Sequence, residues 1–130
     1  MPTIWIIEKD GVLGTLLVGR LHAFGFEATF ISDPHEALAQ LETQAPKLIL
    51  TELSWPGYSP ADWVSALLQK SPNTQMIAVT TLDDPVTLVK VFEAGVSDYM
   101  VKPFDFRMLI DKVRQRCESD VHKNLGIQRT

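Results

Sequence analysis

The sequence predicts a single α/β domain in which five parallel strands alternate with five helices. Its 130 residues suit one domain with one core. Hydrophobic residues make up 45% and charged residues 22%, a balance typical of globular proteins. Short apolar runs alternate along the chain with segments of helical periodicity. Strict alternation of this kind favours parallel strands joined by crossover helices.

The expected strands are short and mostly apolar. The first is a continuous apolar run, which is typical of a strand buried on both faces, and the second alternates apolar and polar residues. The five expected strands are Ile4–Ile7, Glu27–Ile31, Leu48–Leu50 with an end near Thr51 and Glu52, Met76–Val79, and Tyr99–Val101.

Helix starts are indicated by a capping residue followed by proline, a pair that suits the first turn of a helix. These pairs are Asp33-Pro34, Ser59-Pro60 and Asp84-Pro85. Asp105 is expected to cap the last helix, and the polar tail after Cys117 is expected to fray. Gly25 and Gly95 are expected to end the first and fourth helices. The inward-facing positions are expected to be Val12, Leu13, Leu16, Leu17 and Leu21; Leu38 and Leu41; Trp63, Val64, Leu67 and Leu68; Val86, Val89, Val91 and Phe92; and Phe106, Leu109, Ile110 and Val113.

Charge and targeting signals exclude several classes of protein. The net charge of −4 lacks the basic footprint of a nucleic-acid binder. The first residues do not form a signal peptide, and no apolar run approaches the roughly 20 residues that span a bilayer. The single cysteine, Cys117, cannot form an internal disulfide. We therefore expect a cytoplasmic protein that contacts neither nucleic acid nor membrane directly.

Polar residues follow four of the expected strands. In an open parallel sheet, ligand sites form beyond the carboxyl ends of the strands, so these residues should share one rim. Polar residues also end strands in proteins without a site there, so their position alone does not assign a function. The residues are Glu8, Lys9 and Asp10 after the first strand, Thr51 and Glu52 after the third, Thr80 and Thr81 after the fourth, and Lys102 and Pro103 after the fifth.

Four motifs at these strand ends resemble those of the receiver domains of two-component response regulators, and of the chemotaxis-regulator type in particular. They are IWIIEKD, LILTELSWPG, MIAVTT and EAGVSDYMVKPFD, and the resemblance runs from Ile4 to Cys117. It implies a flavodoxin-like, doubly wound (βα)5 three-layer sandwich with sheet order 2-1-3-4-5. It also implies a receiver domain over residues 1–120, a tail or linker start over 121–130, and a signalling module that is not an enzyme and has no catalytic residue.

The resemblance assigns a role to each rim residue. Glu52 falls at the position of the phosphate-accepting aspartate, and Glu8 and Lys9 fall at the acidic pair that helps to hold Mg²⁺. The remaining positions are Thr80 at the switch hydroxyl, Tyr99 at the switch aromatic, Lys102 at the lysine that contacts the phosphoryl oxygens, and Pro103 after a cis peptide bond.

Two of these positions depart from the family pattern. Glu52 is longer than aspartate by one carbon–carbon bond, about 1.5 Å, which displaces its carboxylate from the geometry that in-line phosphoryl transfer needs. Lys9 puts an ammonium, which only donates hydrogen bonds, where a Mg²⁺ ligand should lie. We therefore expect no resident metal, with Mg²⁺ binding lost or weak. Lys9 is expected to lie between Glu52, Glu8 and Asp10 in place of the ion, and the alternative is a decayed pocket with a solvated Lys9.

The functional prediction is a degenerate receiver that acts by phosphorylation-independent protein–protein interaction. Its partners are a histidine kinase, an output domain, an effector or a second copy, bound at the face of the fourth helix, fifth strand and fifth helix. The alternative is a phosphorylatable receiver that accepts a phosphoryl group from a histidine kinase with Mg²⁺. A nucleotide-binding function lacks support, because no Gly-rich phosphate loop follows the first strand. Of the tryptophans, Trp63 is expected in the core and Trp55 at a partly exposed loop position.

Overall fold

Five strands alternate with five helices, as the sequence predicts. The computed structural model describes the backbone of residues 3–129 and the side chains of residues 3–118. The elements are β1 (Thr3–Ile7), α1 (Gly11–Ala23), β2 (Glu27–Ile31), α2 (Pro34–Gln40), β3 (Leu48–Thr51), α3 (Pro60–Lys70), β4 (Gln75–Thr80), α4 (Pro85–Ala94), β5 (Asp98–Val101) and α5 (Phe106–Arg129).

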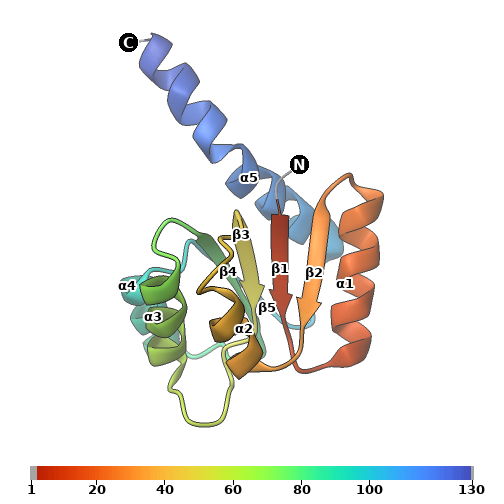
Figure 1. Cartoon of the computed structure of the whole chain (residues 1–130), viewed down its shortest axis with the longest axis vertical. Helices are drawn as coiled ribbons and strands as arrows, with labels where there is room; N and C mark the ends of the chain where they lie inside the picture. The colour runs from red at the N-terminus through yellow and green to blue at the C-terminus, as the bar shows by residue number, and fades with distance from the viewer. Residues whose placement is uncertain (1–2, 130) are drawn as a thin grey trace.

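The strands form one parallel sheet in the order β2-β1-β3-β4-β5, which confirms the predicted topology (Figure 1). Ile7 pairs with Ile31 on one side and with Thr51 on the other, and Thr80 pairs with Val101. Because strands in register end together, their carboxyl ends lie along one edge of the sheet.

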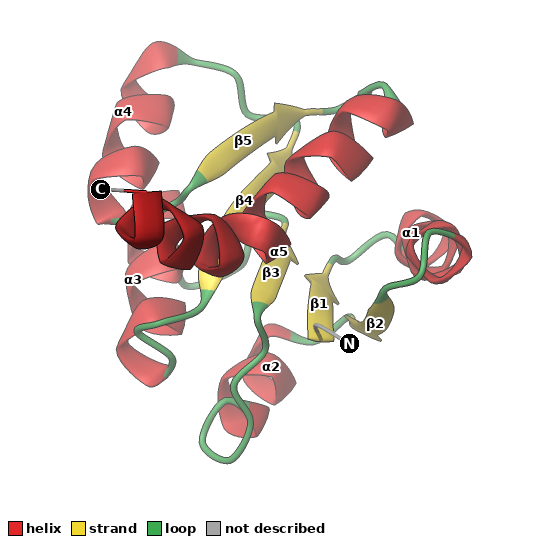
Figure 2. Cartoon of the chain, turned by 90° about the horizontal axis from the view of Figure 1, so that it is seen from above, coloured by secondary structure: helices red, strands yellow, loops and turns green. Residues whose placement is uncertain are grey.

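Helices cover both faces of the sheet, so the core has two halves. Figure 2 shows α2, α3 and α4 on one side and α1 with the first part of α5 on the other. Trp5 and Ile7 of β1 pack in the first half, and Ile4 and Ile6 pack in the second. This explains why β1 is a continuous apolar run: both faces of the strand are buried.

The predicted helix starts are confirmed. The side chains of Asp33, Ser59 and Asp84 each accept a hydrogen bond from a backbone N–H of the helix that follows, and each is followed by proline. Gly95 ends α4 with φ of 124°, in the region that favours glycine.

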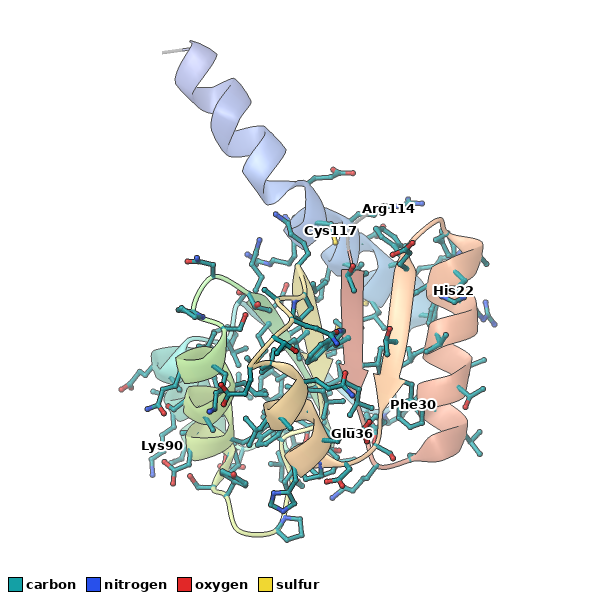
Figure 3. All side chains as sticks on the ribbon, in the orientation of Figure 1. His22, Phe30, Glu36, Lys90, Arg114 and Cys117 are labelled. Atoms are coloured by element: carbon teal, nitrogen blue, oxygen red, sulfur yellow. The ribbon has the colours of Figure 1, made fainter. Side chains whose placement is uncertain are left out.

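The predicted inner faces of α1 and α4 are wider than the observed ones. In α4 only Val91 is fully buried, whereas Val86, Val89 and Phe92 are exposed. In α1, Leu17 and Leu21 face the sheet, and Gly14 lies under the ring of Phe30 (Figure 3). Leu13 and Val18 are partly buried against the same half of the core, whereas Val12 and Leu16 are exposed.

The last helix is longer than predicted. We expected fraying after Cys117, but α5 continues to Arg129, and Figure 1 shows its end projecting away from the sheet. The segment after Cys117 contains no proline and one glycine, so nothing in its local sequence stops a helix. Arg114 and Cys117 lie where α5 leaves the sheet (Figure 3). In the part of the chain that the structure describes, no helix combines the length and apolarity needed to cross a bilayer.

Candidate functional site

Four side chains meet at the carboxyl edge of the sheet: Glu8 after β1, Glu52 after β3, Thr80 at the end of β4 and Lys102 after β5. Three of them continue the hydrogen bonding of the sheet by one residue. The backbone N–H of Glu8 donates to Ile31 O (3.2 Å). The backbone N–H of Glu52 donates to Ile7 O (2.9 Å), and that of Lys102 donates to Thr80 O (2.8 Å). The ends of the strands therefore fix the starting points of these side chains.

Lys102 bridges the two glutamates. Its Nζ lies 2.6 Å from Glu8 Oε1 and 3.0 Å from Glu52 Oε1, and all three side chains are largely shielded from water. Burial alone would lower the pKa of Lys102, but hydrogen bonds and charge from Glu8 and Glu52 outweigh it and raise the pKa above its usual value. Lys102 is therefore a fixed cation between two carboxylates.

Every oxygen of the Glu52 side chain has a partner. Oε2 accepts hydrogen bonds from the backbone N–H groups of Leu53 (2.7 Å) and Ser54 (3.2 Å), while Oε1 faces Lys102. Burial raises the pKa of Glu52, but hydrogen bonds from Thr80, Lys102 and Leu53 more than offset this, so the pKa lies below its usual value. The carboxylate is thus held ionised by contacts that involve no bound ligand.

The predicted place of Asp10 in the acidic pocket is wrong. Its Oδ1 accepts from Val12 N (3.0 Å) and Leu13 N (3.2 Å), so the carboxylate caps α1 and lies exposed. Only its backbone reaches the site, where Asp10 N donates to Glu8 Oε2 (3.0 Å). The start of α1 thereby helps to orient Glu8.

The predicted position of Lys9 between the glutamates is also wrong. Its Nζ donates to the carbonyl oxygen of Ser54 (2.7 Å) and lies 5.7 Å from the ring centroid of Trp55, and the side chain is exposed. Lys102 already lies between the two buried carboxylates, and Lys9 keeps its ammonium at the surface, where its desolvation cost is smaller. Ser54 links the two groups, since its N–H donates to Glu52 and its carbonyl accepts from Lys9.

A chain of hydrogen bonds leads from Glu52 to α4. The Thr80 hydroxyl bonds to Glu52 and accepts from Leu82 N (3.3 Å), and Leu82 O accepts from the Tyr99 hydroxyl (2.6 Å). The Tyr99 ring stacks on Phe92 of α4, with centroids 6.3 Å apart. Burial, together with the negative charges of Asp84, Glu52 and Asp83, raises the pKa of Tyr99 to about 12.

The loop after Glu52 is anchored by two tryptophans. Trp55 Nε1 donates to Glu52 O (2.7 Å), and Trp63 Nε1 donates to the hydroxyl of Thr51 (3.0 Å). Trp63 lies in the core, as predicted, but Trp55 is only 7% exposed, so its predicted partial exposure is wrong. One indole thus holds the carbonyl group of Glu52, and the other holds the side chain of the residue before it.

The rim does not fit a Mg²⁺ ion. Mg²⁺ requires near-octahedral oxygen ligands, but the carboxylates of Glu8 and Glu52 already share Lys102, and the Ser54 carbonyl already accepts from Lys9. Among the described residues, no three His, Cys, Asp or Glu side chains are grouped closely enough to hold a metal. The oxygens at this rim therefore face ammonium groups and do not form a free cluster of ligands.

Sequence reasoning missed the parts of the site that backbone groups supply. Ser54 and Leu82 act through their peptide groups, which every residue type possesses. The identity of these two residues therefore does not indicate their role in the site. The role of Asp10 could have been found, because an aspartate directly before an expected helix is a common cap. The peptide bond between Lys102 and Pro103 is cis, the isomer that the resemblance implies.

Comparison with known proteins agrees with this arrangement. A family model described as response regulator receiver domain matches residues 4–114. The chain is 34% identical over 114 residues to sensory transduction protein RegX3 of Mycolicibacterium smegmatis, covering 88% of this chain and 50% of that protein. It is 31% identical over 113 residues to DNA-binding response regulator MtrA of Mycolicibacterium paratuberculosis, and this match covers 87% of this chain and 50% of that protein. The chain thus spans about half the length of the curated relatives it matches.

A solved structure supports the fold independently. A CheY-like response regulator receiver domain protein from Methanospirillum hungatei JF-1 superposes with a TM-score of 0.87 at 21% identity, covering 95% of this chain and 98% of that one. The family model spans all the rim residues described above and every strand except Thr3, the first residue of β1. With matching sheet order and sequence, the chain belongs to the response regulator receiver domain family.

Proposed function

We propose that this receiver domain is degenerate at its phosphate-accepting position and acts through protein–protein contacts that need no phosphorylation. The observation that carries the proposal is the set of contacts around Glu52. Its carboxylate engages Lys102 and Thr80, the two side chains that the family resemblance assigns to the phosphoryl oxygens. Glu52 makes these contacts with its own oxygens, so it takes the place that a phosphoryl group would occupy.

The electrostatics of the rim support the same proposal. Lys102 is the single ammonium that faces both Glu8 and Glu52. A phosphoryl group would add about 1.5 to 2 negative charges to this site, and in phosphoryl transfer a metal offsets such charge. With both Glu8 oxygens and both Glu52 oxygens already bonded, a phosphoryl group would have to displace Lys102 or the backbone donors.

The proposed partner surface is the face formed by α4, β5 and α5. The hydrogen-bond chain from Glu52 ends at Tyr99, whose ring touches Phe92 on this face. Each of the three elements also exposes a large apolar residue: Val89 on α4, Val101 on β5 and Met108 on α5. Single exposed apolar residues are common. These three, however, belong to the same face as Tyr99, where the series of hydrogen bonds from Glu52 ends, and this suits a surface whose shape depends on Glu52.

The kind of partner follows from the family and from the charge of the chain. We propose a protein: a histidine kinase, an output domain, an effector or a second copy. A relative is named as a DNA-binding response regulator, but the chain matches only about half of that protein. The net charge of −4 favours a protein partner over DNA for the matched half.

Treatment with acetyl phosphate and Mg²⁺, followed by intact-mass measurement, tests the proposal. We expect no phosphoryl adduct on the unaltered chain, because Glu52 is overlong and the metal ligands are occupied. Beryllofluoride is likewise expected to leave the amide NMR spectrum unchanged. An adduct that maps to Glu52 would instead establish the alternative, a receiver phosphorylated in the presence of Mg²⁺.

Restoring the family residues gives the matched variants. Lys9→Asp with Glu52→Asp should bind Mg²⁺ saturably, on the order of millimolar, measured by the fluorescence of the tryptophans near the rim. Neither single change should suffice: Lys9→Asp leaves the long carboxylate of Glu52 on Lys102, and Glu52→Asp leaves the Lys9 ammonium on Ser54. Equal Mg²⁺ affinity in a single variant and the double variant would contradict this account of the rim.

A further inference from the structure

A second concavity lies beside the rim, and it shares with the rim Leu53, Ser54 and Trp55, which donate hydrogen bonds to Glu52. It has a volume of about 480 Å³ and opens between the loop after β3 and the start of α4. Its walls include Lys9, Trp55, Tyr58, Leu82 and Thr87. The concavity is broad and open to solvent, so a ligand there would keep one face exposed.

The ammonium of Lys9 lies in the wall of the pocket, and one of its hydrogen-bond donors is engaged by the protein. Lys9 Nζ donates to Ser54 O and lies over Trp55, and it forms no ion pair with any described carboxylate. An ammonium has three N–H donors, so two remain for a ligand. Because the side chain is exposed, an anion can reach it without displacing a buried group.

The rest of the wall combines polar groups with the flat apolar surfaces of a tyrosine and two prolines. Tyr58 is held edge-on against Trp63, with centroids 5.2 Å apart, so its ring has a fixed orientation. Pro56 and Pro60 flank it in the same pocket, and Leu82 lies on the opposite loop. The hydroxyl of Tyr58 has no hydrogen-bond partner among the described residues, so it too is available to a ligand.

We propose that this pocket binds a small planar organic monoanion of the aromatic carboxylate class. The carboxylate would pair with Lys9, and the ring would lie among Tyr58, Pro56 and Leu82. One available ammonium suits one negative charge, and fixed aromatic and proline surfaces suit a flat apolar body better than a flexible polar one.

The position of the pocket gives such a ligand a route to the switch. Leu82 and Thr87 line the pocket, and the same Leu82 holds Thr80 through its N–H and Tyr99 through its carbonyl. A ligand against Leu82 therefore contacts the segment that joins Glu52 to α4. This step rests on the proposed function, since a receiver that takes no phosphoryl group needs another input.

Fluorine NMR with 4-fluorobenzoate as the probe tests the site, with neutral 4-fluorobenzamide as the matched ligand. We expect saturable binding of the benzoate, with a dissociation constant on the order of 1 mM for so small a ligand. Lys9→Gln should weaken it roughly fivefold, the value of a partly exposed ion pair. Lys90→Gln makes the same change on an exposed part of α4 outside the pocket and should have no effect.

Several outcomes would overturn the site. They are no saturable binding of the benzoate, equal binding of the benzamide, equal loss in the two lysine variants, or equal competition by acetate, which has the charge without the ring. Amide shifts on titration should centre on Tyr58, Leu82 and Thr87, and shifts confined to another surface would also refute it. The acetyl phosphate experiment tests only the proposed function, and the benzoate titration tests only the ligand site. Either proposal can therefore fail without the other.

Discussion

Lys102 is the residue on which the charged rim depends. It pairs with both Glu8 and Glu52, which are almost fully buried and follow strands that are far apart in the sequence. Removing one partner of a buried ion pair is costly because it leaves an uncompensated charge. The position that the sequence marked as unusual, Lys9, makes a different contact, with a backbone carbonyl at the surface. The substitution at Lys9 and the ion pair of Lys102 are therefore separate features, with Ser54 between them.

The lowered pKa of Glu52 predicts how stability depends on pH. A carboxyl group whose pKa is lower in the folded state stabilises the fold above its unfolded value of 4.5, and this contribution is lost as the pH falls through the folded value. Glu52→Gln should therefore cost about 1 kcal/mol near neutral pH, and the difference from the unaltered chain should shrink below about pH 4. Urea unfolding across this range measures both.

Glu93→Gln is the control for this experiment. Glu93 is an exposed carboxylate on α4, outside the rim, so its variant should follow the unaltered chain at every pH. A difference for Glu52→Gln that stays constant down to the lowest pH would mean that the carboxylate gains nothing from Lys102 and Thr80.

The helices differ in how firmly they are tied to the sheet. Helix α4 buries only Val91 fully, and its end depends on Gly95, at φ of 124°. A Cβ at Gly95 would lie 2.4 Å from Leu68 Cδ1, a side chain of α3. The turn after α4 also leads into β5 and so sets the position of Tyr99. Stability of this turn and placement of the proposed partner face are therefore linked.

We predict that Gly95→Ala destabilises the fold by about 2 kcal/mol, through the unfavourable φ and the contact with Leu68. Gly19→Ala is the matched control, since Gly19 lies within α1 with nothing within 4 Å of an added Cβ. Alanine there should stabilise the fold by up to about 1 kcal/mol, because it favours helix over glycine. Urea midpoints of the two variants should move in opposite directions, and movement in the same direction would contradict the argument.

The whole molecule shows which features local sequence patterns encode. Strand order, the helix caps and the meeting of Glu8, Glu52, Thr80 and Lys102 could be predicted, because buried runs, cap-proline pairs and strand ends follow from short patterns and topology. The exposure of Val86 and Val89 could not, because helical periodicity gives a stripe but not the width that the sheet covers. The contact of Lys9 could not either, since it depends on a backbone carbonyl 45 residues away.

The coupling across the molecule can be tested at Thr80, the first step between Glu52 and α4. Thr80→Ala removes the hydroxyl that bonds Glu52 and accepts from Leu82 N. Losing one hydrogen bond of about 1 kcal/mol should speed amide exchange at Leu82 roughly fivefold. A looser Leu82 should also weaken its bond to the Tyr99 hydroxyl and admit water there. Because burial is the largest cause of the raised pKa of Tyr99, that pKa should then fall from about 12, as ultraviolet titration would detect. Thr81→Ala removes an exposed hydroxyl one residue further along the chain and should change neither quantity. If Thr80→Ala accelerates exchange at Leu82 but leaves Tyr99 unaltered, the rim and the α4–β5–α5 face are not joined through this segment, and Glu52 influences only its immediate neighbours.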